Sequence, residues 1–126
     1  MVDAAKVGQW RCSGLRRRGM AKYLLLALNG PTAGEGDEQA YNSWYDGTHL
    51  PGFKSIDGIR SARRYKVMRG KLPGLEAWPY LAVYEIETDD LSAVSARLAR
   101  EFQSFPPTLD RTRSAHLMAI QIGGDD

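Results

Sequence analysis

The sequence predicts an α+β domain in which six elements follow in the order strand, helix, strand, strand, helix, strand. Four stretches have the apolar patterning of strands, and two have the three- and four-residue spacing of amphipathic helices. Glycine- and proline-bearing segments separate them. With right-handed crossovers, this order gives a four-stranded antiparallel sheet with both helices on one face, the ferredoxin-like βαββαβ fold.

The chain has the length and composition of one globular domain. It has 126 residues, of which 43% are hydrophobic and 25% charged. No apolar run approaches the roughly 18 residues of a membrane span. The single cysteine, Cys12, can form no internal disulfide. We therefore expect a cytoplasmic protein that has no structural disulfide and does not bind membranes.

Residues 1–19 differ from the rest of the chain and are expected to form a mobile or weakly docked leader. They carry a net charge of +4, which leaves −2 for residues 20–126. The leader has no apolar core of a signal peptide. Met20 stands directly before the first strand, so an over-extended start is one explanation, and a basic arm that touches RNA or anionic lipid is another. The folded domain is assigned to residues 20–126.

The first predicted strand and helix cover residues 22–29 and 38–49. The strand is apolar on both alternating faces, which indicates burial on two sides and a central place in the sheet. Asp37 is a suitable N-cap, and Pro51-Gly52 is expected to end the helix. Residues at helical spacing predict one aromatic face: Ala40, Tyr41, Trp44, Tyr45 and Thr48.

A hairpin with a long tip is predicted next. Residues 59–68 and 80–87 have strand patterning, and the loop 69–79 joins them. Basic residues crowd the first of these strands, and Glu85 and Glu87 lie on the second. We expect cross-strand ion pairs between them, and an arginine turned toward a ligand is the alternative.

The last two elements are a helix and a strand. From residue 90 to residue 105 apolar residues follow helical spacing, and Pro106-Pro107 stops the helix. Residues 114–122 form the fourth strand. Because the first and fourth strands are apolar on both sides, the face without helices would be exposed in a monomer. We therefore predict a homodimer whose sheets pack face to face around a barrel.

Three segments of the chain resemble a known group of proteins. Residues 41–51 read Tyr-Asn-Ser-Trp-Tyr-Asp-Gly-Thr-His-Leu-Pro, residues 58–65 read Gly-Ile-Arg-Ser-Ala-Arg-Arg-Tyr, and residues 80–85 read Tyr-Leu-Ala-Val-Tyr-Glu. Together they resemble the dimeric α+β barrel superfamily, particularly its EthD-like branch, over about residues 20–123. The resemblance implies a small pocket between helices and sheet, opening toward the dimer barrel.

The resemblance specifies the fold better than the reaction, because this fold hosts many activities. Relatives include muconolactone isomerases, aromatic polyketide cyclases, cofactor-free monooxygenases, EthD-like dehydratases or decarboxylases, and haem enzymes. Several cofactor-free members use a pocket histidine, often with a tyrosine, as general acid or base. His49 matches the histidine-proline motif of the group.

His49 is the leading candidate for catalysis, because an unperturbed imidazole titrates near neutrality. It lies at the end of the first helix, where the helix dipole favours imidazolium, and Asp46 three residues earlier would orient the ring. The structural alternative is a histidine that caps helix carbonyls before Pro51.

His116 is the second histidine, and it shares a strand face with Met118 and Ile120. We expect it to be buried, either as a structural residue or as a second pocket group. The two histidines are too far apart in sequence for a metal motif, so no metal is predicted. No cofactor is predicted, with haem ligated by His116 as the alternative.

The aromatic residues would supply most of the substrate pocket. Tyr84 and Tyr65 are expected to donate hydrogen bonds to a substrate oxygen, and the others to pack in the core or line the pocket. The predicted substrate-binding set is Tyr41, Trp44, Tyr45, Tyr65, Trp78 and His116.

The sequence therefore predicts a cofactor-free lyase, isomerase or cyclase that acts on an aromatic or carbonyl-containing compound of a catabolic or secondary-metabolite pathway. His49 would be the base, Asp46 its orienting partner and Tyr84 a hydrogen-bond donor. A cofactor-independent monooxygenase and a non-catalytic ligand-binding dimer are the alternatives. An RNA-binding module of the same element order is disfavoured, because the third strand lacks the basic and aromatic pattern that stacks bases.

Overall fold

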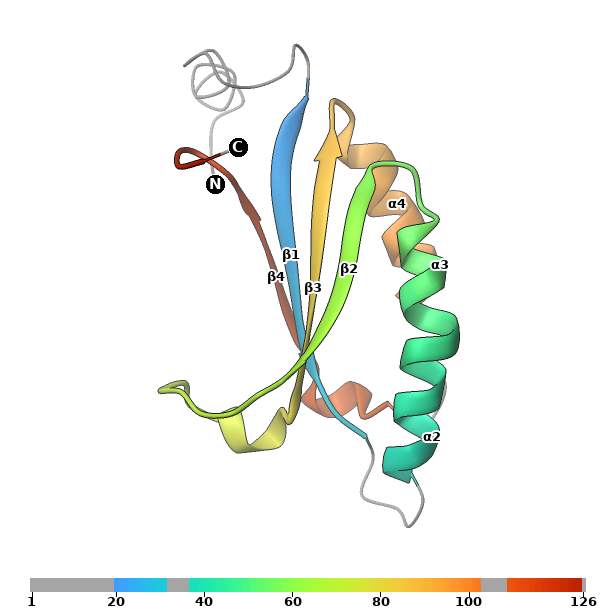
Figure 1. Cartoon of the computed structure of the whole chain (residues 1–126), viewed down its shortest axis with the longest axis vertical. Helices are drawn as coiled ribbons and strands as arrows, with labels where there is room; N and C mark the ends of the chain where they lie inside the picture. Colours follow the sequence, from blue (N-terminus) through green and yellow to red (C-terminus); the bar gives the residue numbers. More distant parts are fainter. Residues whose placement is uncertain (1–19, 32–36, 103–108, 126) are drawn as a thin grey trace.

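The predicted order of elements is confirmed in a computed structural model of the chain, which describes residues 20–31, 37–102 and 109–125. Four strands form one antiparallel sheet in the order β2-β3-β1-β4 (Figure 1). Their bounds are Ala21–Asn29 for β1, Ile59–Lys66 for β2, Tyr80–Thr88 for β3 and Ala115–Ile120 for β4. The predicted leader, residues 1–19, and the predicted end of the second helix lie outside the described residues.

Strand β1 is central, as its apolar pattern predicts. It pairs with β3 over its whole length and with β4 from Tyr23 to Leu28. Residues with odd numbers on β1 face the helices, and those with even numbers face the open side. The hairpin of β2 and β3 is also confirmed, and a one-turn helix, η2 (Leu75–Ala77), lies in its loop.

All long helices cover the same face of the sheet (Figure 1). Residues 37–54 form one continuous rod made of α2 (Asp37–Trp44), a π-helical turn η1 (Tyr45–His49) and α3 (Leu50–Lys54). The second helix is α4 (Leu91–Phe102), and the short η3 (Arg111–Arg113) precedes β4.

The expectation that Pro51-Gly52 ends the first helix is wrong, because the helix passes through them to Lys54. Pro51 lies in the first turn of α3, directly after the π-helical turn. In that turn the N–H of Leu50 donates to the carbonyl of Tyr45, five residues back. In the π-helical turn, backbone hydrogen bonds reach five residues back and not four. Pro51 has no N–H to donate, and it fits at this change of hydrogen-bond pattern better than inside a regular α-helix.

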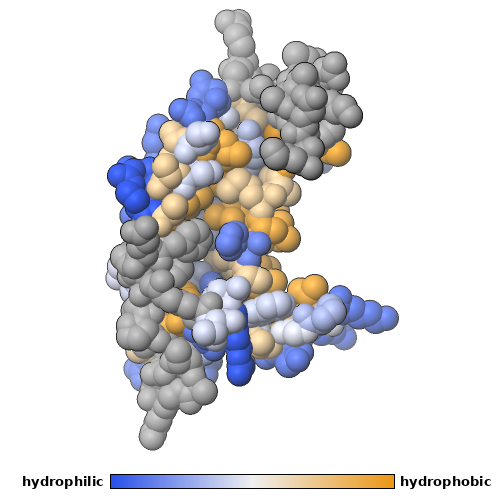
Figure 2. All heavy atoms as spheres, turned by 180° about the vertical axis from the view of Figure 1, so that it is seen from behind, coloured by the Kyte–Doolittle hydropathy of each residue, from blue (hydrophilic) through white to orange (hydrophobic). Residues whose placement is uncertain are grey.

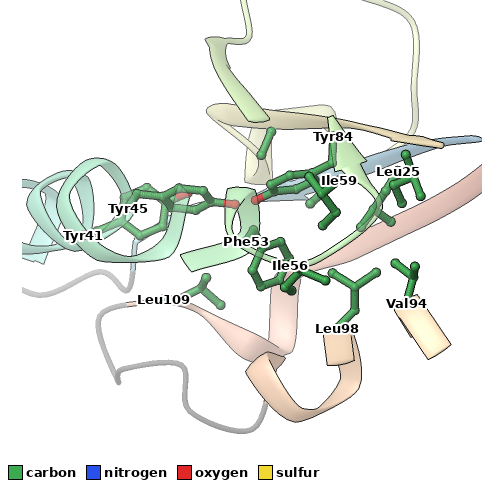
Figure 3. Packing of buried hydrophobic residues seen from close by; sticks show 13 residues of the cluster. Leu25, Tyr41, Tyr45, Phe53, Ile56, Ile59, Tyr84, Val94, Leu98 and Leu109 are labelled. Carbon is green, nitrogen blue, oxygen red and sulfur yellow. The ribbon is translucent and has the colours of Figure 1, made fainter. Parts of the chain in front are cut away.

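The core lies between the helices and the sheet (Figure 3). Aromatic residues from the rod meet aliphatic residues of β1, β3 and α4 there. The largest fully buried side chains are Tyr41, Tyr45, Tyr84, Phe53, Leu25 and Ile86. Tyr41, Trp44 and Tyr45 therefore form the predicted aromatic face, whereas Ala40 and Thr48, which were also expected on it, are exposed.

The second sheet face carries no helix and is largely apolar. Leu24 and Leu117 are 36% and 52% exposed on its two neighbouring strands. Figure 2 shows hydrophobic side chains gathered in a hollow on the side of the molecule away from the rod.

The hairpin of β2 and β3 carries two of the predicted cross-strand ion pairs. They are Arg60–Glu87 at 3.3 Å and Arg63–Glu85 at 2.9 Å. Within the described ranges, no helix is long and apolar enough to cross a membrane.

Two glycines test the backbone account. Gly58 has φ +99°, and a Cβ there would come within 3.0 Å of Val94 Cγ2. Gly52 lies in α3, and its Cβ would meet nothing within 4 Å. We expect Gly58→Ala to lower the free energy of unfolding by about 1–2 kcal/mol or more, and Gly52→Ala to raise it by about 0.5–1 kcal/mol. Urea denaturation measures both changes. A Gly58→Ala variant with an unchanged free energy of unfolding would contradict the turn geometry.

Candidate functional site

The rod places side chains at four-residue spacing against the sheet. Tyr41, Tyr45, His49 and Phe53 all point inward, and none is more than 5% exposed. We call these four residues the aromatic stripe. An α-helix of 3.6 residues per turn would rotate such a series away from the sheet, and the π-helical turn at residues 45–49 reduces that drift.

The His49 imidazole is enclosed by aromatic rings. It stacks on Trp44 with centroids 4.7 Å apart, and its centroid lies 4.1 Å from that of Phe53. Tyr45 and Tyr84 meet it edge to face at 4.7 and 6.3 Å. The structure thus brings His49 together with three of the predicted site residues, Trp44, Tyr45 and Tyr84.

The expectation that the helix dipole favours the imidazolium form of His49 is wrong. Burial, with a smaller contribution from the Arg64 charge, lowers the pKa of His49 to about 3, so the imidazole is neutral at physiological pH. The helix dipole cannot offset this desolvation, because the helix continues past His49 to Lys54.

Asp46 also differs from its predicted role as the orienting partner of His49. Its carboxylate faces outward and pairs with Arg64, Oδ1 to Nη1 at 3.0 Å. The π-helical turn keeps His49 on the buried side of the rod and leaves Asp46 exposed. The ring of His49 is instead positioned by its aromatic neighbours.

A buried amide links the tyrosines of the stripe. The Tyr41 hydroxyl donates to Asn29 Oδ1, and Asn29 Nδ2 donates to the Tyr45 hydroxyl at 3.2 Å. Sequence reasoning missed Asn29. The available signal was an amide at the end of a strand whose other residues on that face are apolar or aromatic, since a buried amide needs partners.

Tyr84 joins this group from the sheet. Its side chain is fully buried, and its hydroxyl points toward that of Tyr45 (Figure 3). Within the described part of the chain, the Tyr84 oxygen has no hydrogen-bond partner of ordinary geometry. Burial raises the pKa of Tyr84, so the group is a neutral donor.

Arg64 reaches the helix side of the sheet, which the sequence did not predict. A β-bulge between Ile59 and Ser61 shifts the register, so the following residues exchange faces. The guanidinium carbon lies 4.4 Å from the centroid of the Tyr45 ring, and Nη2 donates to Asn42 Oδ1 at 2.8 Å. Its side chain is only 12% exposed.

Two predicted pocket residues lie elsewhere. Tyr65 is 49% exposed on the opposite sheet face, because the same bulge that turns Arg64 inward turns Tyr65 outward. Trp78 lies after η2, and its indole N–H donates to the Arg113 carbonyl at 2.5 Å. Trp78 therefore fixes the base of the loop and does not join the His49 cluster.

His116 is exposed, contrary to expectation, because β4 is an edge strand. It faces the helix side opposite Ala27, a choice of face that the sequence left open. There it lines a mainly apolar cleft of about 560 Å³ between α4 and β4. The cleft also includes Leu25, which belongs to the buried core and pairs with Tyr84 in the sheet, so the cleft reaches the edge of that core. Among the described residues, no cluster of three or more His, Cys, Asp and Glu could hold a metal.

Comparisons with known proteins support the fold. No family model and no curated protein matches the sequence. The chain is similar to several crystal structures, among them the following three. An EthD family protein from Bacillus halodurans is 18% identical with a TM-score of 0.50, covering 78% of this chain and 96% of its own. HapK from Hahella chejuensis is 14% identical with a TM-score of 0.53, covering 84% and 96%.

The third is a DABB family protein with a ferredoxin-like fold from Mesorhizobium loti. It is 10% identical with a TM-score of 0.51, and the match covers 82% of this chain and 99% of that one. The resemblance predicted from the sequence is thus confirmed at the level of the fold, that of the ferredoxin-like α+β barrel proteins.

The buried neutral imidazole makes stability depend on pH. His49 binds a proton with a pKa of about 6.5 when unfolded but of about 3 when folded. The contribution of His49 to the free energy of unfolding is therefore fully present above pH ~6.5. It decreases as the pH falls toward ~3, by up to ~1.4 kcal/mol per pH unit. In urea denaturation from pH 7 to 4.5, His49→Gln should lose this part of the slope.

His116→Gln is the matched control, because it removes the other imidazole of the chain and leaves His49 in place. The part of the slope that belongs to His49 should remain in this variant. Equal slopes for wild type and His49→Gln would show that His49 is not buried in its neutral form.

Proposed function

We propose that this protein is a small-molecule enzyme that uses His49 for proton transfer at a carbon next to a carbonyl, as a lyase, isomerase or cyclase does. The observation that carries this proposal is the neutral imidazole of His49 beside Tyr84, a buried hydroxyl without a hydrogen-bond partner among the described residues. A base and an acid of this kind are what enolisation requires. The chemistry needs no cofactor.

His49 and Tyr84 have separate roles in the proposed proton transfer. The imidazole of His49 accepts the proton from the carbon, and the C–H electron pair becomes the carbon–carbon double bond of an enolate. The carbonyl electron pair moves to oxygen, where the Tyr84 hydroxyl donates a hydrogen bond. The imidazolium then returns the proton to the same or another carbon, or the enolate expels a leaving group.

The low pKa of His49 fits this cycle. In the unliganded protein the imidazole is neutral, so it is already in the base form at neutral pH. A negative charge that develops on the substrate nearby raises the pKa of His49 and favours proton transfer to it. The surrounding rings suit a flat, aromatic or conjugated substrate.

The cleft between α4 and β4 supplies a place for the rest of the substrate. Its lining is mainly apolar, and Ser95 and His116 are its polar side chains. Leu25 lines the cleft and lies opposite Tyr84 on the neighbouring strand, so the cleft approaches the proposed donor. His116 thus contributes to binding in this proposal, at a distance from the proton transfer.

Proton abstraction can be tested without knowing the natural substrate. We expect the protein to exchange C–H for C–D next to the carbonyl in a panel of aromatic ketones and cyclic β-diketones in D₂O, followed by NMR. His49→Gln should lower the exchange rate by about 10²-fold or more. Wild-type exchange no faster than in buffer, or equal to that of folded His49→Gln, would refute the proposed function. Thr48→Ala, exposed on the rod beside His49, should keep the wild-type rate.

We also propose that the protein is a homodimer that packs through its bare sheet faces. The exposed apolar face with Leu24 and Leu117 supports this arrangement, because a second copy would remove that surface from water. Leu117→Glu should convert the dimer to a monomer in native mass spectrometry. Ala93→Glu, exposed on α4, should remain dimeric. A wild-type monomer at micromolar concentration would contradict the proposed assembly.

A further inference from the structure

Two buried donors stand out because no hydrogen bond satisfies them. Arg64 Nε and the Tyr84 hydroxyl oxygen are buried, and neither has a hydrogen-bond partner within the part of the chain that the structure describes. Leaving a buried donor unpaired costs free energy, so such groups are rare in folded proteins. Both groups are donors, so a single acceptor atom could satisfy them together.

The sheet register places these two residues beside each other. Arg64 pairs with Ala82, and Tyr84 lies two residues further along the same strand, β3. Both side chains lie on the helix side, as diagonal neighbours whose separation is about 7–8 Å at the backbone. Ala62, opposite Tyr84, and Ala82 are the intervening residues on this face, and each presents only a methyl group.

Tyr45 contacts both donors from the helix side. Its ring packs against the Arg64 guanidinium, and its hydroxyl points toward that of Tyr84 (Figure 3). Burial raises the pKa of Tyr84 while the Arg64 charge acts in the opposite direction, which places the two groups within electrostatic reach. A ligand atom held by both donors would therefore lie next to Tyr45, whose ring also meets His49.

The rest of the guanidinium is already engaged. Nη1 binds Asp46 and Nη2 binds Asn42, both on the rod. These bonds fix the plane of the group and leave Nε, on the inner edge, as the donor without a partner. Because Asp46 lies at the outer end and is itself exposed, solvent screens its charge more than that of Arg64.

We propose that Arg64 and Tyr84 form a subsite for one anionic oxygen of the ligand, an enolate or phenolate. Arg64 Nε–H and the Tyr84 hydroxyl each donate to that oxygen, and the positive charge of Arg64 favours its ionised form. The inference rests on the proposed function for the identity of this oxygen as the former carbonyl oxygen of the substrate. This subsite adds Arg64 to the site. It would favour ligands that present a hydrogen-bond acceptor over those that present a donor.

Equilibrium binding of 4-nitrophenol tests this subsite, because its phenol and phenolate forms absorb at different wavelengths. In slightly acidic buffer, adding the protein should increase the phenolate band. The phenolate should bind about tenfold or more tightly than 4-nitrotoluene, which has a similar shape and no acceptor oxygen at that position. No turnover is involved, so this result is independent of C–H exchange.

Three variants identify the donors. Tyr84→Phe should lower phenolate affinity about tenfold, and so should Arg64→Lys, which keeps the charge without the Nε–H; Arg64→Met should lower it further. Tyr84→Phe should leave thermal stability unchanged or raised, since it removes an unpaired buried hydroxyl. Arg63→Met, one residue along β2 on the opposite face, should bind like wild type.

The results separate the two proposals. Wild type that does not prefer the phenolate, or folded Tyr84→Phe and Arg64→Lys that bind it like wild type, would overturn the subsite. Because Tyr84→Phe is isosteric, this decision stands even if Arg64→Met does not fold. Phenolate binding that depends on Arg64 and Tyr84, together with no C–H exchange, would refute the proposed reaction and leave the subsite in place.

Discussion

The packing of the aromatic stripe on the sheet determines most of what this protein can do. Four side chains of one rod, Tyr41, Tyr45, His49 and Phe53, are removed from water together. The sheet accepts them because Ala82 and Ala27, adjacent on β3 and β1, present only methyl groups on this face. Rings on one layer and small residues on the other give close contact, and an imidazole placed there loses its hydration.

This dry environment sets the charges of the site. Desolvation favours the neutral form of His49 and of the tyrosines, and it strengthens every remaining electrostatic interaction. Arg64 remains charged in this environment, because its guanidinium makes cation–π contacts with three tyrosine rings and an ion pair with Asp46. A neutral base, a neutral donor and one fixed cation are thereby held together among buried aromatic rings.

The sequence predicted the fold because the fold depends on patterns that local spacing reveals. The doubly apolar β1, the amphipathic α4 and the hairpin were all identified from the period of their apolar residues. The candidate site was predicted less completely. His49, Trp44, Tyr45 and Tyr84 do lie together, since helical spacing and strand alternation fix their directions.

The missed features arise from single-residue irregularities, which periodicity does not reveal. The bulge after Ile59 exchanges the faces of β2, and this brings Arg64 in and turns Tyr65 out. The π-helical turn carries the rod through Pro51 and moves Asp46 away from His49. Each changes which residues meet by one position, and in a site of this size one position decides the set of functional groups.

The chemistry of the site depends on His49 being a neutral imidazole among buried aromatic rings. NMR titration of its ring proton and carbon resonances measures this charge state. The His49 signals should remain those of one neutral tautomer down to the pH at which the protein unfolds. A His49 midpoint near 6.5, the ordinary pKa of a histidine, would show that the ring is not buried in its neutral form.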